Sequence, residues 1–261
     1  MFELDELAYS SACIKWSPMG KFVFVMTLLI SSLLADSLMV PVVVLIIGVV
    51  LLGYSIRFKF PKVIGIILLE SLGLILIGSI VIAAVTAGDT VWSIDLYFFQ
   101  VNFTDHGIFT ASLVTVRALA GVSVMLFFAT STPIPYFADM LIRFKVPKEF
   151  AELMTMVYRY SFMLFDEAGR MHLAAQCRLG FRGKMNTVRT YAQMMVGMFI
   201  RSIETAERHN IGMQCRNYQS NVCLFREPKG IGYAWVAASA LSFLALYMLN
   251  LTCVQAGMLL G

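Results

Sequence analysis

The chain is 261 residues long and carries a formal net charge of +4 at pH 7. Hydrophobic residues make up 59% of it and charged residues only 14%, whereas soluble globular domains contain about 45–50% apolar and about 25% charged residues. This composition excludes an ordinary soluble domain and predicts a protein of the membrane.

Two apolar runs near the start of the chain, residues 22–34 and 38–52, are separated by Ala35-Asp36-Ser37. Each run is shorter than the about 20 residues that an upright membrane helix needs, so the stretch predicts either two short helices or one broken helix. Basic residues flank it on both sides: Lys15, Lys21, Arg57, Lys59 and Lys62. Because basic flanks stay on the cytoplasmic side, we expect the chain to go out and come back.

Three longer apolar segments follow, at residues 63–87, 107–130 and 230–251. Residues 88–106 contain aromatic residues but no Lys or Arg, which predicts an outer loop lying along the membrane interface. Fourteen of the 20 Lys and Arg residues lie between residues 132 and 230, and such basic segments normally stay in the cytoplasm.

The predicted fold class is therefore an all-α membrane protein. It has about five transmembrane helices and a cytoplasmic set of about three coupling helices between the last two spans. The predicted parts are residues 1–130 for the N-terminal membrane helices, 131–229 for the cytoplasmic coupling-helix domain and 230–261 for the C-terminal membrane helix.

Two charged residues, Glu70 and Arg117, lie inside predicted spans. A charge inside a bilayer is costly unless it is paired or faces the protein interior. The pair predicts either a coupling or ion-path function, or, as the plainer interpretation, one structural ion pair. A third possibility is that Glu70 lies near enough to the inner surface to reach water.

The cytoplasmic block opens with a proline-rich stretch in which Pro133 and Pro135 break the preceding span, as prolines do, and mark a hinge. Residues 136–144 predict a short helix. Residues 148–178 and 187–216 then repeat apolar side chains at helical spacing, which predicts two long amphipathic helices. Their apolar faces are rich in methionine, a flexible side chain that can repack.

These two helices end in the same phrase. Residues 166–178 and 204–216 align with Gln-Cys-Arg at the end of each copy, and a breaker follows both. The repeat predicts two similar helix ends that present Arg178 and Arg216 to two similar docking sites. The alternative is a coincidental sequence similarity between two amphipathic helices. Since an arginine fork pairs bidentately with a carboxylate, acidic grooves on a dimeric motor protein are the natural partners.

The sequence lacks the signatures of a catalytic site. It contains no phosphate-binding loop, no HExxH zinc motif and no nucleophile elbow, and its three histidines form no cluster. We therefore expect no catalytic residue, no bound metal and no cofactor in this chain. The arginines between residues 132 and 230 alternate with Met and Leu, so we expect no binding of nucleic acid.

Four stretches resemble the transmembrane T component of energy-coupling factor (ECF) transporters, most closely its cobalt-type branch, CbiQ. They are Leu4-Asp5 with Ser17-Pro-Met-Gly-Lys21, Thr132-Pro-Ile-Pro135, Tyr158-Arg-Tyr160 running into Ala175-Gln-Cys-Arg-Leu-Gly180, and Arg201-Ser202 running into Met213-Gln-Cys-Arg-Asn-Tyr218. The family's two signature tripeptides read roughly Ala-Arg-Gly. This chain keeps the arginines but has cysteine in place of alanine, and Leu179 and Asn217 where glycine is common.

The resemblance implies that the ATPase-coupling residues are Ala175, Gln176, Cys177, Arg178, Leu179, Gly180, Met213, Gln214, Cys215, Arg216 and Asn217. It implies a complex in the prokaryotic cell membrane with two ABC-type ATPases, which bind ATP and magnesium, and with a substrate-binding S component. It also allows a small accessory membrane subunit.

Several choices stay open at this level. The transported substrate is expected to be cobalt, with nickel and a vitamin as alternatives. A different function, that of a self-sufficient transporter or channel, would use Glu70 and Arg117 as its path. The lack of inverted-repeat halves argues against a secondary transporter.

Overall fold

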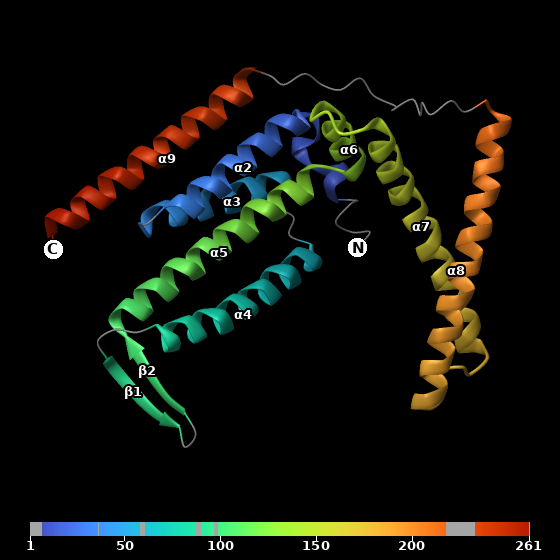
Figure 1. Ribbon diagram of the computed structural model, residues 1–261, viewed down its shortest axis with the longest axis horizontal. Helices are drawn as coiled ribbons and strands as arrows, with labels where there is room; N and C mark the ends of the chain where they lie inside the picture. Colours follow the sequence, from blue (N-terminus) through green and yellow to red (C-terminus); the bar gives the residue numbers. More distant parts are fainter. Residues whose placement is uncertain are drawn as a thin grey trace. The chain divides into compact units, whose positions relative to one another are not determined.

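The computed structural model describes residues 7–35, 37–57, 61–86, 90–96, 99–217 and 233–260. The chain divides into two compact units, one formed by Met1–Pro133 with Lys229–Gly261 and the other by Ile134–Pro228. Figure 1 shows the helices of both units.

The larger unit contains most of the apolar helices. Its elements are a short 3-10 helix (Ala12–Lys15), α2 (Pro18–Leu34), α3 (Met39–Ser55), α4 (Lys62–Val85), β1 (Thr90–Leu96), β2 (Phe99–Thr104), α5 (Asp105–Ser131) and α9 (Tyr233–Leu260). Among the described residues, three helical stretches are long and apolar enough to cross a bilayer: Lys62–Ala83, Gly107–Ser131 and Trp235–Cys253. The prediction of an all-α membrane protein is confirmed, apart from the small hairpin.

The first apolar stretch forms two helices, so the choice left open by the sequence is settled. Helix α2 begins at Pro18, whose missing N–H costs nothing at a first helical position, and the Ser17 hydroxyl accepts a hydrogen bond from the Gly20 amide at 3.4 Å. The Lys21 ammonium donates to the Ser131 carbonyl at 2.5 Å, and the Ser55 hydroxyl donates to the Thr130 carbonyl. The start of α2 and the end of α3 thus meet at the same end of α5.

Helices α2, α3 and α5 share the core of this unit. Leu28, Val44, Val124 and Phe127 are almost fully buried in one cluster. Gly48 of α3 lets α5 come close, because a Cβ atom there would lie only 3.0 Å from Val124 Cγ2. Small residues allow such close helix packing in lipid, where the hydrophobic effect between helices is absent. Helix α9 packs along α2.

Residues 90–104 differ from the predicted interfacial loop. Residues 90–96 and 99–104 form two antiparallel strands, β1 and β2, with Ile94 opposite Val101 and Asp95 opposite Gln100. The segment is rich in β-branched and aromatic residues, which favour strands. The absence of basic residues gave information on the side of the membrane and none on backbone conformation.

The smaller unit contains α6 (Ile134–Arg143), α7 (Lys148–Cys177) and α8 (Lys184–Cys215). Pro133 lies between α5 and α6, and Pro135 lies in the first turn of α6, where proline is tolerated; their function as a hinge stays a prediction. Lys145 ends α6 with a left-handed φ of 61°, and Pro147 is the N-cap of α7. Helices α7 and α8 run antiparallel and contact each other (Figure 1).

Candidate functional site: the ends of α7 and α8

The repeated Gln-Cys-Arg phrase is a repeated helix end. Helices α7 and α8 finish at Cys177 and Cys215, and their C-caps are Arg178 and Arg216, with φ, ψ of −89°, 9° and −95°, 15°. The next residues, Leu179 and Asn217, have left-handed φ values of 58° and 54°. The two copies therefore share a backbone conformation as well as a sequence.

The hydrogen bonds at the α7 end explain this conformation. The Leu179 amide donates to the Gln176 carbonyl at 3.0 Å, and the Gly180 amide donates to the Ala175 carbonyl at 2.9 Å. This pair of bonds defines the Schellman motif, in which a left-handed residue turns the chain back over the last carbonyls. At the α8 end the Asn217 amide donates to the Gln214 carbonyl at 3.0 Å, and the next residue lies outside the described part of the chain.

Gly180 is required by a close contact. The Thr190 hydroxyl donates to the Gly180 carbonyl at 2.8 Å, and a Cβ atom on residue 180 would lie 3.0 Å from that same hydroxyl oxygen. The turn between α7 and α8 is therefore held against the first part of α8. This contact fixes the position of Arg178, two residues earlier.

Both arginines are exposed. Among the residues that the structure describes, neither guanidinium group makes a hydrogen bond or an ion pair. A cation at the C-terminus of a helix is favoured by the partial negative charge of the last carbonyls. Each arginine is thus favourably placed at its helix end and is available to a carboxylate on another protein.

The two arginines lie at opposite ends of the α7–α8 pair. The pair is antiparallel, since Met171 packs on Gly197 and the Tyr160 ring lies 5.2 Å from the His209 ring. Thr190, beside the α7 end, precedes Arg216 by 26 residues. At 1.5 Å per residue, the arginines are about 39 Å apart along the helix axis.

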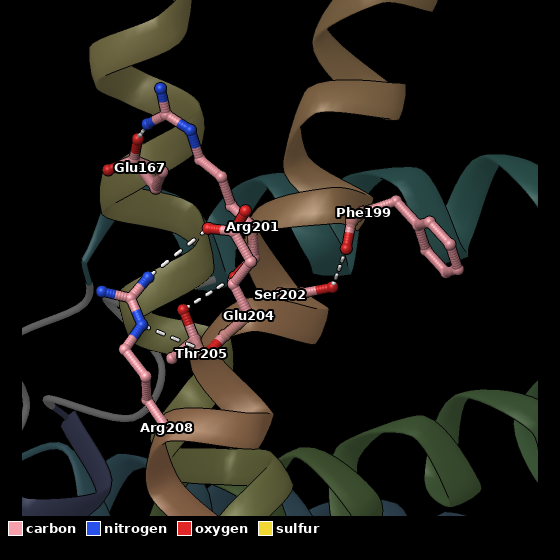
Figure 2. A network of polar contacts seen from close by, with 7 residues as sticks. All are labelled: Glu167, Phe199, Arg201, Ser202, Glu204, Thr205 and Arg208. Atoms are coloured by element: carbon pink, nitrogen blue, oxygen red, sulfur yellow. Dashed lines mark hydrogen bonds and ion pairs between the residues drawn. The ribbon is translucent and has the colours of Figure 1, made fainter.

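An ion pair joins the two helices between these ends. Arg201 of α8 pairs with Glu167 of α7, whereas Arg208 pairs with Glu204 of its own helix at 3.5 Å (Figure 2). A groove of about 700 Å³ lies beside them, lined in part by Tyr160 and Met198. Among the described residues, the Glu167–Arg201 ion pair links α7 to α8.

Helix α8 has no buried residue, and α7 is buried only near its start. Large apolar side chains therefore remain exposed along both helices. They include Phe150, Leu153, Val157, Met163, Phe165, Leu173, Met185, Val188, Met195, Val196, Phe199, Ile200 and Ile211. Exposed apolar surface of this extent marks an interaction site.

Sequence reasoning overlooked how the end of α5 is held. Lys21, the last residue of one stretch named by the family resemblance, is only 2% exposed, and its ammonium group donates to the carbonyl of Ser131. A lysine at the start of an apolar run was the available signal. This contact secures the last turn of α5 just before Pro133.

Glu70 and Arg117 do not form the ion pair that the sequence suggested. An Arg117 Nη atom donates to the Ala35 carbonyl at 2.6 Å, and Glu70 is exposed on α4. Within the described ranges, no group of three His, Cys, Asp or Glu side chains could hold a metal ion.

Comparisons with known proteins match this sequence to a family. The family model described as CbiQ, cobalt transport protein, matches residues 10–223. An uncharacterized protein of Methanocaldococcus jannaschii is 30% identical over 225 residues, which cover 85% of this chain and 83% of that protein.

Two further relatives carry cobalt-transport names. A protein of Methanocorpusculum labreanum, named as a fused cobalt transport protein CbiMQ, is 27% identical over 97% of this chain and 42% of its own length. The cobalt transport protein CbiQ of Rhodobacter capsulatus is 29% identical over 52% of this chain and 56% of its own length. The chain thus spans less than two thirds of either of these relatives. It belongs to the CbiQ family of cobalt transport proteins and is a multi-pass membrane component of a transport system in the prokaryotic cell membrane.

Proposed function

We propose that this chain is the non-catalytic coupling subunit of an ECF-type ABC importer, which passes ATP-driven motion from two cytoplasmic ATPases to a substrate-binding membrane subunit. The observation that carries the proposal is the pair of matching helix ends. Each presents one exposed arginine that has no partner among the described residues.

Two matching ends fit two matching grooves. An arginine fork forms a bidentate, charge-assisted pair with a carboxylate, which fixes orientation as well as position. Two copies of an ATPase, or two similar ATPases, would each offer one acidic groove. ATP and magnesium would be bound by those subunits, so this chain needs no cofactor of its own.

The exposed apolar faces of α7 and α8 suit the second partner. A membrane subunit that binds the substrate can rest on these methionine-rich surfaces and follow their movement, because methionine side chains repack at low cost. A relative named for both CbiM and CbiQ as one fused chain supports a CbiM-like partner. The substrate most consistent with the family is cobalt, and nickel or a vitamin is the alternative.

The first prediction concerns assembly. Arg178→Ala or Arg216→Ala should weaken the hold on one ATPase by about 1.5–3 kcal/mol, or roughly ten- to a hundredfold, because each leaves a groove carboxylate unpaired. The double variant should release the ATPases far more completely, since two linked contacts reinforce each other. Co-purification of the ATPases and metal uptake by cells measure both effects.

Arg189→Ala, an exposed arginine inside α8, is the matched control and should keep the complex. Native cysteines give a second readout: Cys177 and Cys215 are exposed beside the arginines, whereas Cys13 is buried. Burial also raises the pKa of the Cys13 thiol, with Lys21 opposing this. Bound ATPases should protect Cys177 and Cys215 from maleimide. An intact complex with normal uptake in the double arginine variant would refute the proposal.

A further inference from the structure

In the described part of its unit, helix α4 is covered on one side only. Its Ser79 hydroxyl donates to the Ala111 carbonyl of α5, and Ile64 is fully buried. In the most apolar 18-residue stretch of α4 only 6% of the residues are buried, whereas 39% are buried in the corresponding stretch of α5. Among the described elements its main contacts are with α5 and β2.

Glu70 lies on the uncovered side of α4. Residues at i−4, i+3 and i+7 share a helix face, so Ile66, Gly73 and Ile77 lie on the same face as Glu70. Ile66 is 60% and Ile77 is 65% exposed, and nothing comes within 4 Å of a Cβ atom placed on Gly73. We call these four residues the Glu70 face. Within the described part of the chain, Glu70 makes no hydrogen bond or ion pair.

The depth of Glu70 makes this exposure costly. It follows Lys62, the first residue of α4, by eight positions, which is about 12 Å at 1.5 Å per residue. The other end of the helix, Val85, is about 22 Å away, and the hydrocarbon core of a bilayer is about 30 Å thick. A glutamate lacks the long stem with which Lys and Arg reach the interface. In hydrocarbon its carboxyl group needs a hydrogen-bond partner.

We propose that the Glu70 face is an intramembrane docking surface for a transmembrane helix of another subunit that carries a basic side chain. Charge complementarity selects that occupant, because an acidic group in lipid is satisfied best by a cation that is also a donor. Gly73 leaves room for the partner backbone to come close, as small residues do in membrane helix pairs. The proposal rests on the membrane placement of α4 and is independent of the coupling role.

A second copy of this chain is a poor occupant. A two-fold contact brings the same patch of both copies together, so the two Glu70 carboxyl groups would face each other. The intramembrane cation Arg117 is already bonded to Ala35 and only partly exposed.

Crosslinking in the native membrane tests the surface directly. A benzoylphenylalanine at position 66, 73 or 77 should capture one transmembrane peptide of another subunit that contains Lys, Arg or His. The same probe at Leu72, which lies on the opposite side of α4, should not capture it. Capture of lipid alone, of a second copy of this chain, or of a helix without a basic residue would overturn the proposal.

Substitution gives the independent test. With an affinity tag on this chain, Glu70→Leu should reduce the recovered membrane partner at least tenfold and Glu70→Gln less, because Gln can still accept a hydrogen bond. Ile77→Leu is the matched control and should recover wild-type amounts. Replacing the captured basic residue with Leu in the Glu70→Leu background should restore recovery.

Full recovery of the membrane partner with Glu70→Leu would overturn the docking surface. The ATPases should be recovered with every Glu70 variant, since their proposed contacts are Arg178 and Arg216. Loss of the ATPases only in the arginine variants, with normal recovery for Glu70→Leu, would reject this surface and leave the coupling role standing.

Discussion

The conformation of each docking arginine depends on the residue that follows it. Leu179 and Asn217 both hold a left-handed φ, which brings Cβ close to the following carbonyl oxygen and costs about 1–2 kcal/mol for most residues. Asparagine tolerates this conformation better than leucine, and glycine tolerates it best. The family resemblance implies that glycine is common at this position. The backbone conformation explains this preference, because the residue closes the helix just after the arginine.

Replacing Leu179 with glycine should accordingly stabilise the end of α7. Relief of the left-handed strain, less the about 0.5–1 kcal/mol that glycine costs through unfolded-state entropy, predicts a gain of about 0.5–1 kcal/mol. Asn217→Gly should gain less. Thermal unfolding of the purified protein measures the change. Leu173→Gly, at an exposed interior position of α7, is the control and should lose about 1 kcal/mol. Equal losses at both leucines would contradict the left-handed cap.

The sequence predicted where α7 and α8 end, because an arginine followed by a helix-breaking residue is a local signal. It could not decide whether Glu70 and Arg117 meet. Ser79 lies beside Ala111 on antiparallel helices, so Glu70 is level with residue 120, only about one turn from Arg117. The two residues therefore lie at nearly the same level along the axes of α4 and α5. Glu70 nevertheless lies on the opposite side of α4 from α5, and the rotation of one helix against another is set by packing along both.

At the scale of the helices, the Glu167–Arg201 pair has a function that its neighbour Glu204–Arg208 cannot have. The first pair joins α7 to α8, and the second joins two turns of α8 (Figure 2). The Arg201 side chain is 58% exposed, so this pair should contribute no more than about 0.2–1 kcal/mol to stability. Its effect should instead be on the relative position of the two helix ends.

Spin labels on Cys177 and Cys215, with the other cysteines replaced, can measure that position. Each cysteine lies one residue inside its arginine, so we expect an axial distance of about 36 Å, and a broader distance distribution in Glu167→Gln than in the wild type. Glu204→Gln should leave the distribution unchanged. Combining Glu167→Arg with Arg201→Glu should narrow it again. Equal broadening by the Glu167 and Glu204 variants would show that the interhelix pair has no such effect.

The helix boundaries themselves were largely predictable. The predicted spans at residues 63–87 and 107–130 correspond to Lys62–Val85 and Asp105–Ser131, because apolar length is a strong signal. The register between α7 and α8 was not. Folding the chain symmetrically about the turn near residue 182 would place Glu167 opposite residue 197, one helical turn from its partner Arg201. Met171 occupies that place, packed on Gly197, and such side-chain packing is not visible in periodicity.

At the scale of the whole molecule, the distribution of charge predicts which side each part faces. The hairpin formed by β1 and β2 belongs to a segment without Lys or Arg, whereas α7 and α8 belong to the segment with most of them. Basic segments stay in the cytoplasm. Asp95 should therefore lie outside the cell, on the opposite side of the membrane from Cys177 and Cys215.

Cysteine labelling in sealed right-side-out vesicles tests this prediction. In an Asp95→Cys variant in which the native cysteines are replaced, a membrane-impermeant maleimide should react without permeabilisation. In a variant whose only cysteines are Cys177 and Cys215, the same maleimide should react only after the vesicles are permeabilised. This opposite accessibility needs an odd number of crossings between the hairpin and α7. Helix α5 supplies one crossing, since it is one of the three described helices that are long enough to span. Labelling of residue 95 only after permeabilisation would place the hairpin on the cytoplasmic side, where α5 could not be a span unless α7 and α8 were outside.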